Sequence, residues 1–114
     1  MSLRTVNLET GRPDLETARR RLLAEIESAR REGVRLLKVI HGYGSSGSGG
    51  VLAVGIRKSL RLRVKEGKAL TVVAGERFSS DANETRALLQ KYPRLRADRD
   101  LNHANPGITI VELS

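Results

Sequence analysis

The sequence contains no cysteine, and this absence excludes disulfide bonds and thiolate-ligated metal sites. It leaves the redox compartment of the protein open. The two histidines, His41 and His103, lie far apart along the chain. A structural zinc site is therefore not expected, and we predict no bound metal of this kind.

Long apolar runs are missing as well. No stretch of about 18 apolar residues is present, so we expect no membrane-spanning helix and no membrane partner. The first residues lack the apolar core of a signal peptide, which favours a cytoplasmic location. Aromatic residues are scarce: Tyr43, Phe78 and Tyr92 are too few to build an extended platform for base stacking.

Positive charge is abundant. The 114 residues include 21 Lys and Arg against 13 Asp and Glu, a net charge of +8, and the pI is near 10.8. Such an excess favours a polyanionic partner or an anionic surface. The length suits one domain, and no internal repeat or linker divides it. We therefore expect a single domain over residues 1–114.

Apolar spacing predicts alternating strands and helices. Strands are expected near residues 5–8, 35–40, 69–74 and 108–113, and helices near residues 13–32, 51–66 and 82–91. The first helix buries Leu15, Ala18, Leu22, Ile26 and Ala29, and the second buries Leu52, Ile56, Leu60 and Val64. This order predicts an α/β, two-layer sandwich: a mixed, mostly parallel four-stranded sheet with two main helices. Residues 76–106 form an insertion before the last strand. Right-handed crossovers place the ends of the first two strands at one edge.

The most informative segment is residues 41–50. An apolar strand ends at His41, only Gly, Ser and Tyr follow, and a helix opens near Val51. A glycine-rich turn before a helix presents backbone N–H groups and a positive dipole end to an anion. The candidate phosphate-binding residues of this turn are Gly42, Tyr43, Gly44, Ser45, Ser46 and Gly47.

Three interpretations of this turn compete. A flexible connector is one, although connectors usually span about 2–6 residues. Nucleotide binding is the second, because residues 42–47 fit G-x-G-x-x-G. The acidic ribose partner should then follow about 20 residues later, and Glu76 comes too late. A P-loop is excluded because no Gly-Lys-Ser/Thr occurs. The third is a grip on the phosphate backbone of nucleic acid, which the positive charge favours.

The arrangement resembles the Smr (small MutS-related) domain over nearly the whole chain. His41-Gly42-Tyr43-Gly44 matches the family's His-Gly-x-Gly turn, and residues 107–113 match its closing strand. The family's second motif, Leu-Asp-x-His, ends the first strand. Here Asn7 stands for the aspartate and Glu9 for the histidine. These departures, the longer turn and the insertion indicate a divergent bacterial branch.

The resemblance implies a fold similar to the C-terminal domain of translation initiation factor three. It also implies binding of DNA or RNA, since Smr domains bind nucleic acid and several act as nicking endonucleases or ribonucleases. Residues 41–44 keep the family's turn. Asn7 and Glu9 do not keep its first motif, which weakens the case for cleavage in this chain.

The candidate catalytic residues are His41, Glu9 and Asn7. His41 would bind phosphate or serve as general acid or base, unless it only caps nearby carbonyls. Glu9 would orient His41, act as a base or hold a divalent metal, unless it is a surface charge. Asn7 cannot take up a proton and can only orient a neighbour. Tyr43 either stacks on a base or folds onto the domain.

We conclude from the sequence that the chain binds nucleic acid through residues 41–50 and nearby cations. Arg57, Lys58 and Arg61, on or near the second helix, are the candidate phosphate ligands, although solvated helices often carry such charges. The sequence leaves weak endonuclease activity open. We expect nucleic-acid binding to require no cofactor. A divalent metal would be needed only if the chain cleaves its substrate. The alternatives are a small-molecule phosphate or nucleotide binder and a protein-interaction module.

Overall fold

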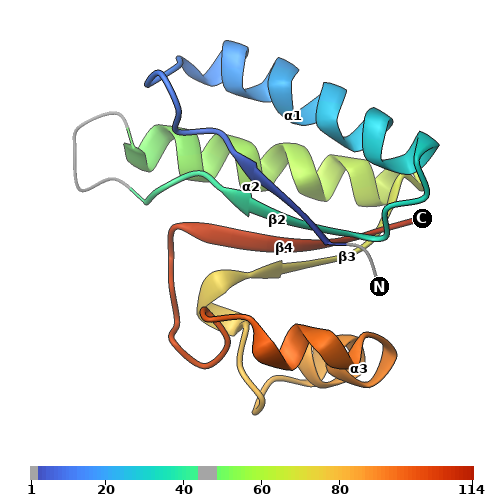
Figure 1. Ribbon diagram of the computed structural model, residues 1–114. Helices are drawn as coiled ribbons and strands as arrows, with labels where there is room; N and C mark the ends of the chain where they lie inside the picture. Colours follow the sequence, from blue (N-terminus) through green and yellow to red (C-terminus); the bar gives the residue numbers. More distant parts are fainter. Residues whose placement is uncertain (1–2, 44–48) are drawn as a thin grey trace.

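The centre of the fold is a four-stranded mixed sheet with helices packed on both faces (Figure 1). The computed structural model describes residues 3–43 and 49–114. The elements are β1 (Leu3–Asn7), α1 (Leu15–Arg31), β2 (Leu36–Ile40), α2 (Gly49–Lys65), β3 (Ala69–Ala74), the 3₁₀ helix η1 (Gly75–Arg77), α3 (Asn83–Lys91), the 3₁₀ helix η2 (Pro93–Ala97) and β4 (Ile108–Leu113). The predicted α/β fold with four strands is confirmed.

The strand order is β1-β2-β4-β3, and the pairing in this order corrects the expectation of a mostly parallel sheet. β1 and β2 pair in parallel, whereas β4 pairs antiparallel with both β2 and β3. β1, β2 and β3 therefore run in one direction, as expected. The sheet is nonetheless mostly antiparallel in its pairing, because β4 lies between two strands of opposite direction.

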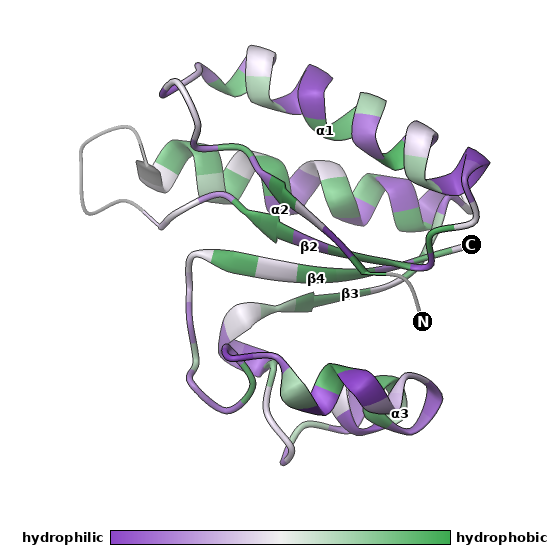
Figure 2. Cartoon of the chain, in the orientation of Figure 1, coloured by the Kyte–Doolittle hydropathy of each residue, from purple (hydrophilic) through white to green (hydrophobic). Residues whose placement is uncertain are grey.

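Both faces of the sheet are covered, so the two-layer description is incomplete. α1 and α2 pack on one face, where Leu22, Val39 and Ile56 belong to a buried cluster. Residues 75–107 cover the other face, where Phe78, Leu88 and Ile110 form a second cluster (Figure 1). β4 is buried along its whole length, and Figure 2 shows that most of its residues are hydrophobic. The expected insertion thus supplies a third layer.

The two long helices follow from their sequences with small differences. Asp14 caps α1 by accepting a hydrogen bond from the Thr17 amide at 2.8 Å. Of the predicted apolar face of α1, Ala18, Leu22, Ile26 and Ala29 are buried, and Leu15 is partly buried. α2 begins at Gly49, two residues earlier than expected. Val64 is 38% exposed rather than buried, because every fourth position rotates by about 40° around a helix of 3.6 residues per turn. No helix among the described residues has the length and apolar character to cross a membrane.

A buried ion-pair cluster fixes the insertion to the sheet. Lys38 of β2 is almost fully buried, and its Nζ lies 2.8 Å from Asp98 and 2.6 Å from Asp100. Burial alone raises the pKa of Asp100, but hydrogen bonds from Lys38 and Asn105 lower it below its ordinary value of 3.8. The charged form of Asp100 therefore stabilises the folded state.

Acid is expected to loosen this attachment. A carboxyl group whose pKa is lowered by folding contributes stability above its unfolded pKa, and the contribution is lost as pH falls through the folded value. We expect the free energy of unfolding to fall below about pH 4. Asp100→Asn should show a flatter decline over the same range. Urea unfolding between pH 7 and pH 2.5 measures both curves, and parallel curves would contradict the prediction.

Candidate functional site

The ends of β1 and β2 meet at one edge of the sheet, as the crossovers predict. Asn7 is in register with Ile40, and the Leu8 amide donates a hydrogen bond to the Ile40 carbonyl at 2.8 Å. The Glu9 amide donates to Asn7 Oδ1 at 2.9 Å. This edge therefore brings the two departures from the Smr motif, Asn7 and Glu9, beside the start of the glycine-rich turn.

Gly42 is needed for this close approach. Its φ is +72°, and a Cβ added there would collide with the carboxylate of Glu9. The positive φ disfavours any residue with a side chain, whereas the exposed Glu9 carboxylate could move aside. From the other side, the amides of His41 and Gly42 donate to the Gly107 carbonyl at 2.9 and 3.1 Å. The start of the turn is thus held between the end of β1 and the segment before β4.

His41 lies next to Glu9 in the fold, but its side chain turns away from the edge. The imidazole is fully buried, with Nδ1 2.6 Å from the Gly42 carbonyl and Nε2 2.8 Å from Thr109 Oγ1. A carbonyl only accepts, so Nδ1 carries the proton. In the neutral ring Nε2 then accepts the Thr109 hydroxyl proton. Both ring nitrogens are occupied within the protein.

Burial favours the neutral form of this imidazole. Burial lowers the pKa of His41 below its ordinary value of 6.5, and the Arg57 guanidinium lowers it further, against opposing effects of the Gly42 carbonyl and Glu76. A buried, neutral and fully bonded histidine fits the capping interpretation. The predicted roles of His41 as acid–base group or phosphate ligand stay predictions, and either role would require breaking one of these two hydrogen bonds.

Arg57 joins four segments of the chain. Its Nε donates to Thr109 Oγ1 at 3.1 Å, and its two terminal nitrogens bind both oxygens of Glu76 at 3.1 and 2.7 Å. Nη2 also lies 3.1 Å from the carbonyls of Pro106 and Ile108. The hydrogen bond from Arg57 lowers the pKa of Glu76. Arg57 therefore acts as a structural centre, and its predicted contact with phosphate would require breaking these bonds.

Sequence reasoning missed the partners in this network. Thr109 interrupts the apolar run of β4, and that interruption was the available signal for a buried polar contact. Glu76 entered only as a poor candidate for a ribose ligand. The sequence around Gly107 did not indicate its role. Its carbonyl accepts hydrogen bonds from the start of the turn only because the folded chain brings the two segments together.

The exposed candidates at the edge are Asn7, Glu9 and Tyr43, and Tyr43 is 59% exposed. The remaining turn candidates, residues 44–47, lie outside the described residues. Within residues 3–43 and 49–114, no group of three or more His, Cys, Asp or Glu side chains is placed to hold a metal ion. Glu9 offers one carboxylate, and Asn7 Oδ1 is already bonded to the Glu9 amide. A divalent metal at this edge therefore stays a prediction that depends on cleavage.

The charged residues of α2, the helix that follows the turn at this edge, are all positive. The helix contains Arg57, Lys58, Arg61, Arg63 and Lys65 and no acidic residue. Arg57 and Arg63 are turned inward and paired with Glu76 and Glu66. Lys58 and Arg61 are exposed, and neither forms an ion pair within the described part of the chain. Two of the three predicted phosphate-binding side chains on α2 therefore face solvent.

Comparison with known proteins agrees with this fold. The family model of the Smr domain matches residues 11–76. The solved structure of the Smr domain of Thermus thermophilus MutS2 is similar to this chain, with 18% sequence identity and a TM-score of 0.57 over 100% of this chain and 99% of that one. No curated protein matches the sequence. Because the family model covers more than half of the residues, the chain belongs to the Smr domain family.

Proposed function

We propose that this Smr domain binds DNA or RNA through the phosphate backbone, using the outward face of α2 and the glycine-rich turn that precedes it. The observation that carries the proposal is the charge of α2, a 17-residue helix with five basic residues and no acidic one. The nucleic-acid binding that the family resemblance implies supports the same conclusion.

The geometry of α2 suits a phosphate chain. Lys58 and Arg61 stand three residues apart, so they are neighbours on the helix surface. The helix N-terminus, which carries the positive dipole end, follows the glycine-rich turn and has no acidic residue in its first turn. Tyr43, exposed where the turn begins, supplies one ring for stacking on a base. Contacts of this type bind the backbone with little sequence preference.

Cleavage has less support than binding. Glu9 is exposed at the edge but brings negative charge toward a negative phosphate, and Asn7 cannot exchange a proton. The buried His41 offers no ring nitrogen to solvent. We therefore propose that nuclease activity is weak or absent, while the backbone-binding surface is retained.

The affinity for polynucleotides is expected to depend strongly on salt. With about three to five phosphates contacted, the logarithm of the association constant should fall with log salt at a slope of roughly −2 to −4.5. Lys58→Gln with Arg61→Gln should flatten that slope by about 1.4–1.8, because two phosphate contacts are lost. Fluorescence anisotropy with labelled single- and double-stranded DNA and RNA measures these slopes.

The matched control is Arg20→Gln with Arg30→Gln, which removes the same charge from exposed positions of α1. An equal loss in that control, or an affinity insensitive to salt, would contradict the proposal. A thermal shift with mononucleotides and none with polynucleotides would instead favour a small-molecule phosphate binder.

A further inference from the structure

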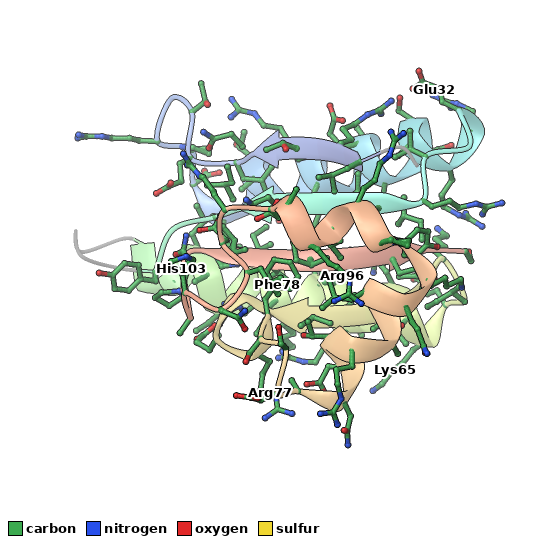
Figure 3. All side chains as sticks on the ribbon, turned by 60° about the horizontal axis from the view of Figure 1, so that its bottom comes forward. Glu32, Lys65, Arg77, Phe78, Arg96 and His103 are labelled. Carbon is green, nitrogen blue, oxygen red and sulfur yellow. The ribbon has the colours of Figure 1, made fainter. Side chains whose placement is uncertain are left out.

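A polar pocket lies on the face of the sheet opposite α1 and α2. It is an open surface pocket of about 500 Å³ between α3 and η2, in which every lining residue except Leu89 is exposed. The lining residues are Ser80, Asn83, Arg86, Ala87, Leu89, Gln90 and Arg96. Figure 3 shows Arg96 on this insertion layer, which Figure 1 places on the far side of the sheet from α2. The pocket is therefore separate from the surface proposed above.

The spacing of side chains along α3 builds one wall. Asn83, Ala87 and Gln90 recur at intervals of four and three residues, so they line a single face of the helix together with Arg86. Leu89, 2% exposed, closes the apolar side. Ala87 ends in a methyl group and leaves space where a longer side chain would fill the pocket. Arg96 comes from η2.

The acidic residues of the insertion do not neutralise the positive charge of the two arginines in this pocket. Glu76, Glu84, Asp98 and Asp100 are paired with Arg57, Arg77 and Lys38. Asp81, the remaining acid of the insertion, is not among the residues lining the pocket. Within the described part of the chain, Arg86 and Arg96 form no ion pair. Arg86 is instead held by a hydrogen bond from its Nη2 to Asn83 Oδ1.

We propose that this pocket binds a phosphate group. Two guanidinium groups, two side-chain amides and the Ser80 hydroxyl supply hydrogen-bond donors, and the pocket lining includes no carboxylate. Planar guanidinium groups match the oxygens of phosphate in geometry and charge. A volume near 500 Å³ accommodates a phosphate with part of the organic group that carries it. The source is either a nucleic-acid phosphate or a free phosphorylated molecule.

Binding is tested on the whole chain at constant ionic strength with two probes: inorganic phosphate and a short oligonucleotide with a 5′-phosphate. NMR of the arginine Nε–Hε signals should show saturable shifts at Arg86 and Arg96. Arg96→Gln should weaken binding of the effective probe at least about tenfold, which corresponds to one charge-assisted contact of about 1.4 kcal/mol or more. Saturation by inorganic phosphate identifies a free phosphate site, and saturation by the oligonucleotide alone identifies a nucleic-acid phosphate.

Two variants make the test specific. Arg94→Gln removes the same charge from the same 3₁₀ helix at an exposed position outside the pocket, and it should leave binding within about twofold. Ala87→Leu keeps every charge but fills the space, and it should abolish saturation. Unsaturable shifts with both probes, or an equal loss in Arg94→Gln, would overturn the inference. Lys58→Gln with Arg61→Gln should weaken overall binding of the oligonucleotide but leave the Arg86 and Arg96 shifts at saturation unchanged. The two sites can therefore fail or succeed independently.

Discussion

Arg57→Met is expected to lower the free energy of unfolding by about 2–4 kcal/mol. The variant leaves the carbonyls of Pro106 and Ile108 and the Thr109 hydroxyl without their donor, and each buried acceptor left unpaired costs about 1–3 kcal/mol. Part of this cost is recovered where water reaches the vacated space, since the Arg57 side chain is 19% exposed. Urea unfolding followed by circular dichroism measures the change.

Lys58→Met is the natural control, because it removes the same charge from the next residue of α2, which is exposed. It should change stability by less than about 0.5 kcal/mol and should weaken polynucleotide binding. Under conditions in which Arg57→Met is folded, its association constant for polynucleotides should keep most of its dependence on salt concentration. The opposite pattern, a stable Arg57→Met that loses the slope, would return Arg57 to the role of phosphate ligand.

The second large effect concerns catalysis. Asn7→Asp with Glu9→His is expected to create or raise nicking activity, by up to about 10²–10⁴, the usual contribution of a positioned proton-transfer group. Both residues are exposed at the edge of the sheet where the glycine-rich turn begins with Gly42. The new pair would therefore lie beside the turn that we propose as a phosphate-binding element. Conversion of supercoiled plasmid to the nicked form, and cleavage of structured RNA, measure the rate with magnesium, manganese or chelator.

The unmodified chain should show little or no cleavage under the same conditions. Strong cleavage that disappears in Glu9→Gln would contradict this expectation and make Glu9 a base or metal ligand. Asn7→Asp alone is a suitable control, because it restores the aspartate of the motif and leaves Glu9 in place. His41→Ala cannot serve as a simple catalytic test, since the loss of its two hydrogen bonds disturbs the turn itself.

Local sequence signals predicted the elements well because each depends on neighbours in the chain. The spacing of Ala18, Leu22 and Ile26 marked the buried face of α1, and all three are buried. The shared edge of β1 and β2 followed from the handedness of a parallel crossover. Both inferences use rules that act over one or two elements.

The errors arose where distant segments decide the outcome. No local sequence signal between Ala69 and Leu113 indicates that β4 pairs with β2. The order of the strands in the sheet was therefore not predictable from the spacing of apolar residues. The orientation of His41 depends on Thr109, 68 residues later, and the burial of Arg57 depends on Glu76 and the segment before β4. The local sequence around His41 therefore carried no signal of the direction in which its side chain points.

The place of β4 in the sheet also governs how the chain can be assembled during synthesis. β3 pairs with β4 and with no other strand of the described sheet, and β4 follows the other three strands in the sequence, so it leaves the ribosome after them. Until Leu113 emerges, β2 and β3 each present an unpaired edge, which is the feature that promotes unwanted strand pairing. The sheet is therefore completed only when β4 is available, and folding of this domain is expected to be a late, single event relative to the synthesis of its first three strands.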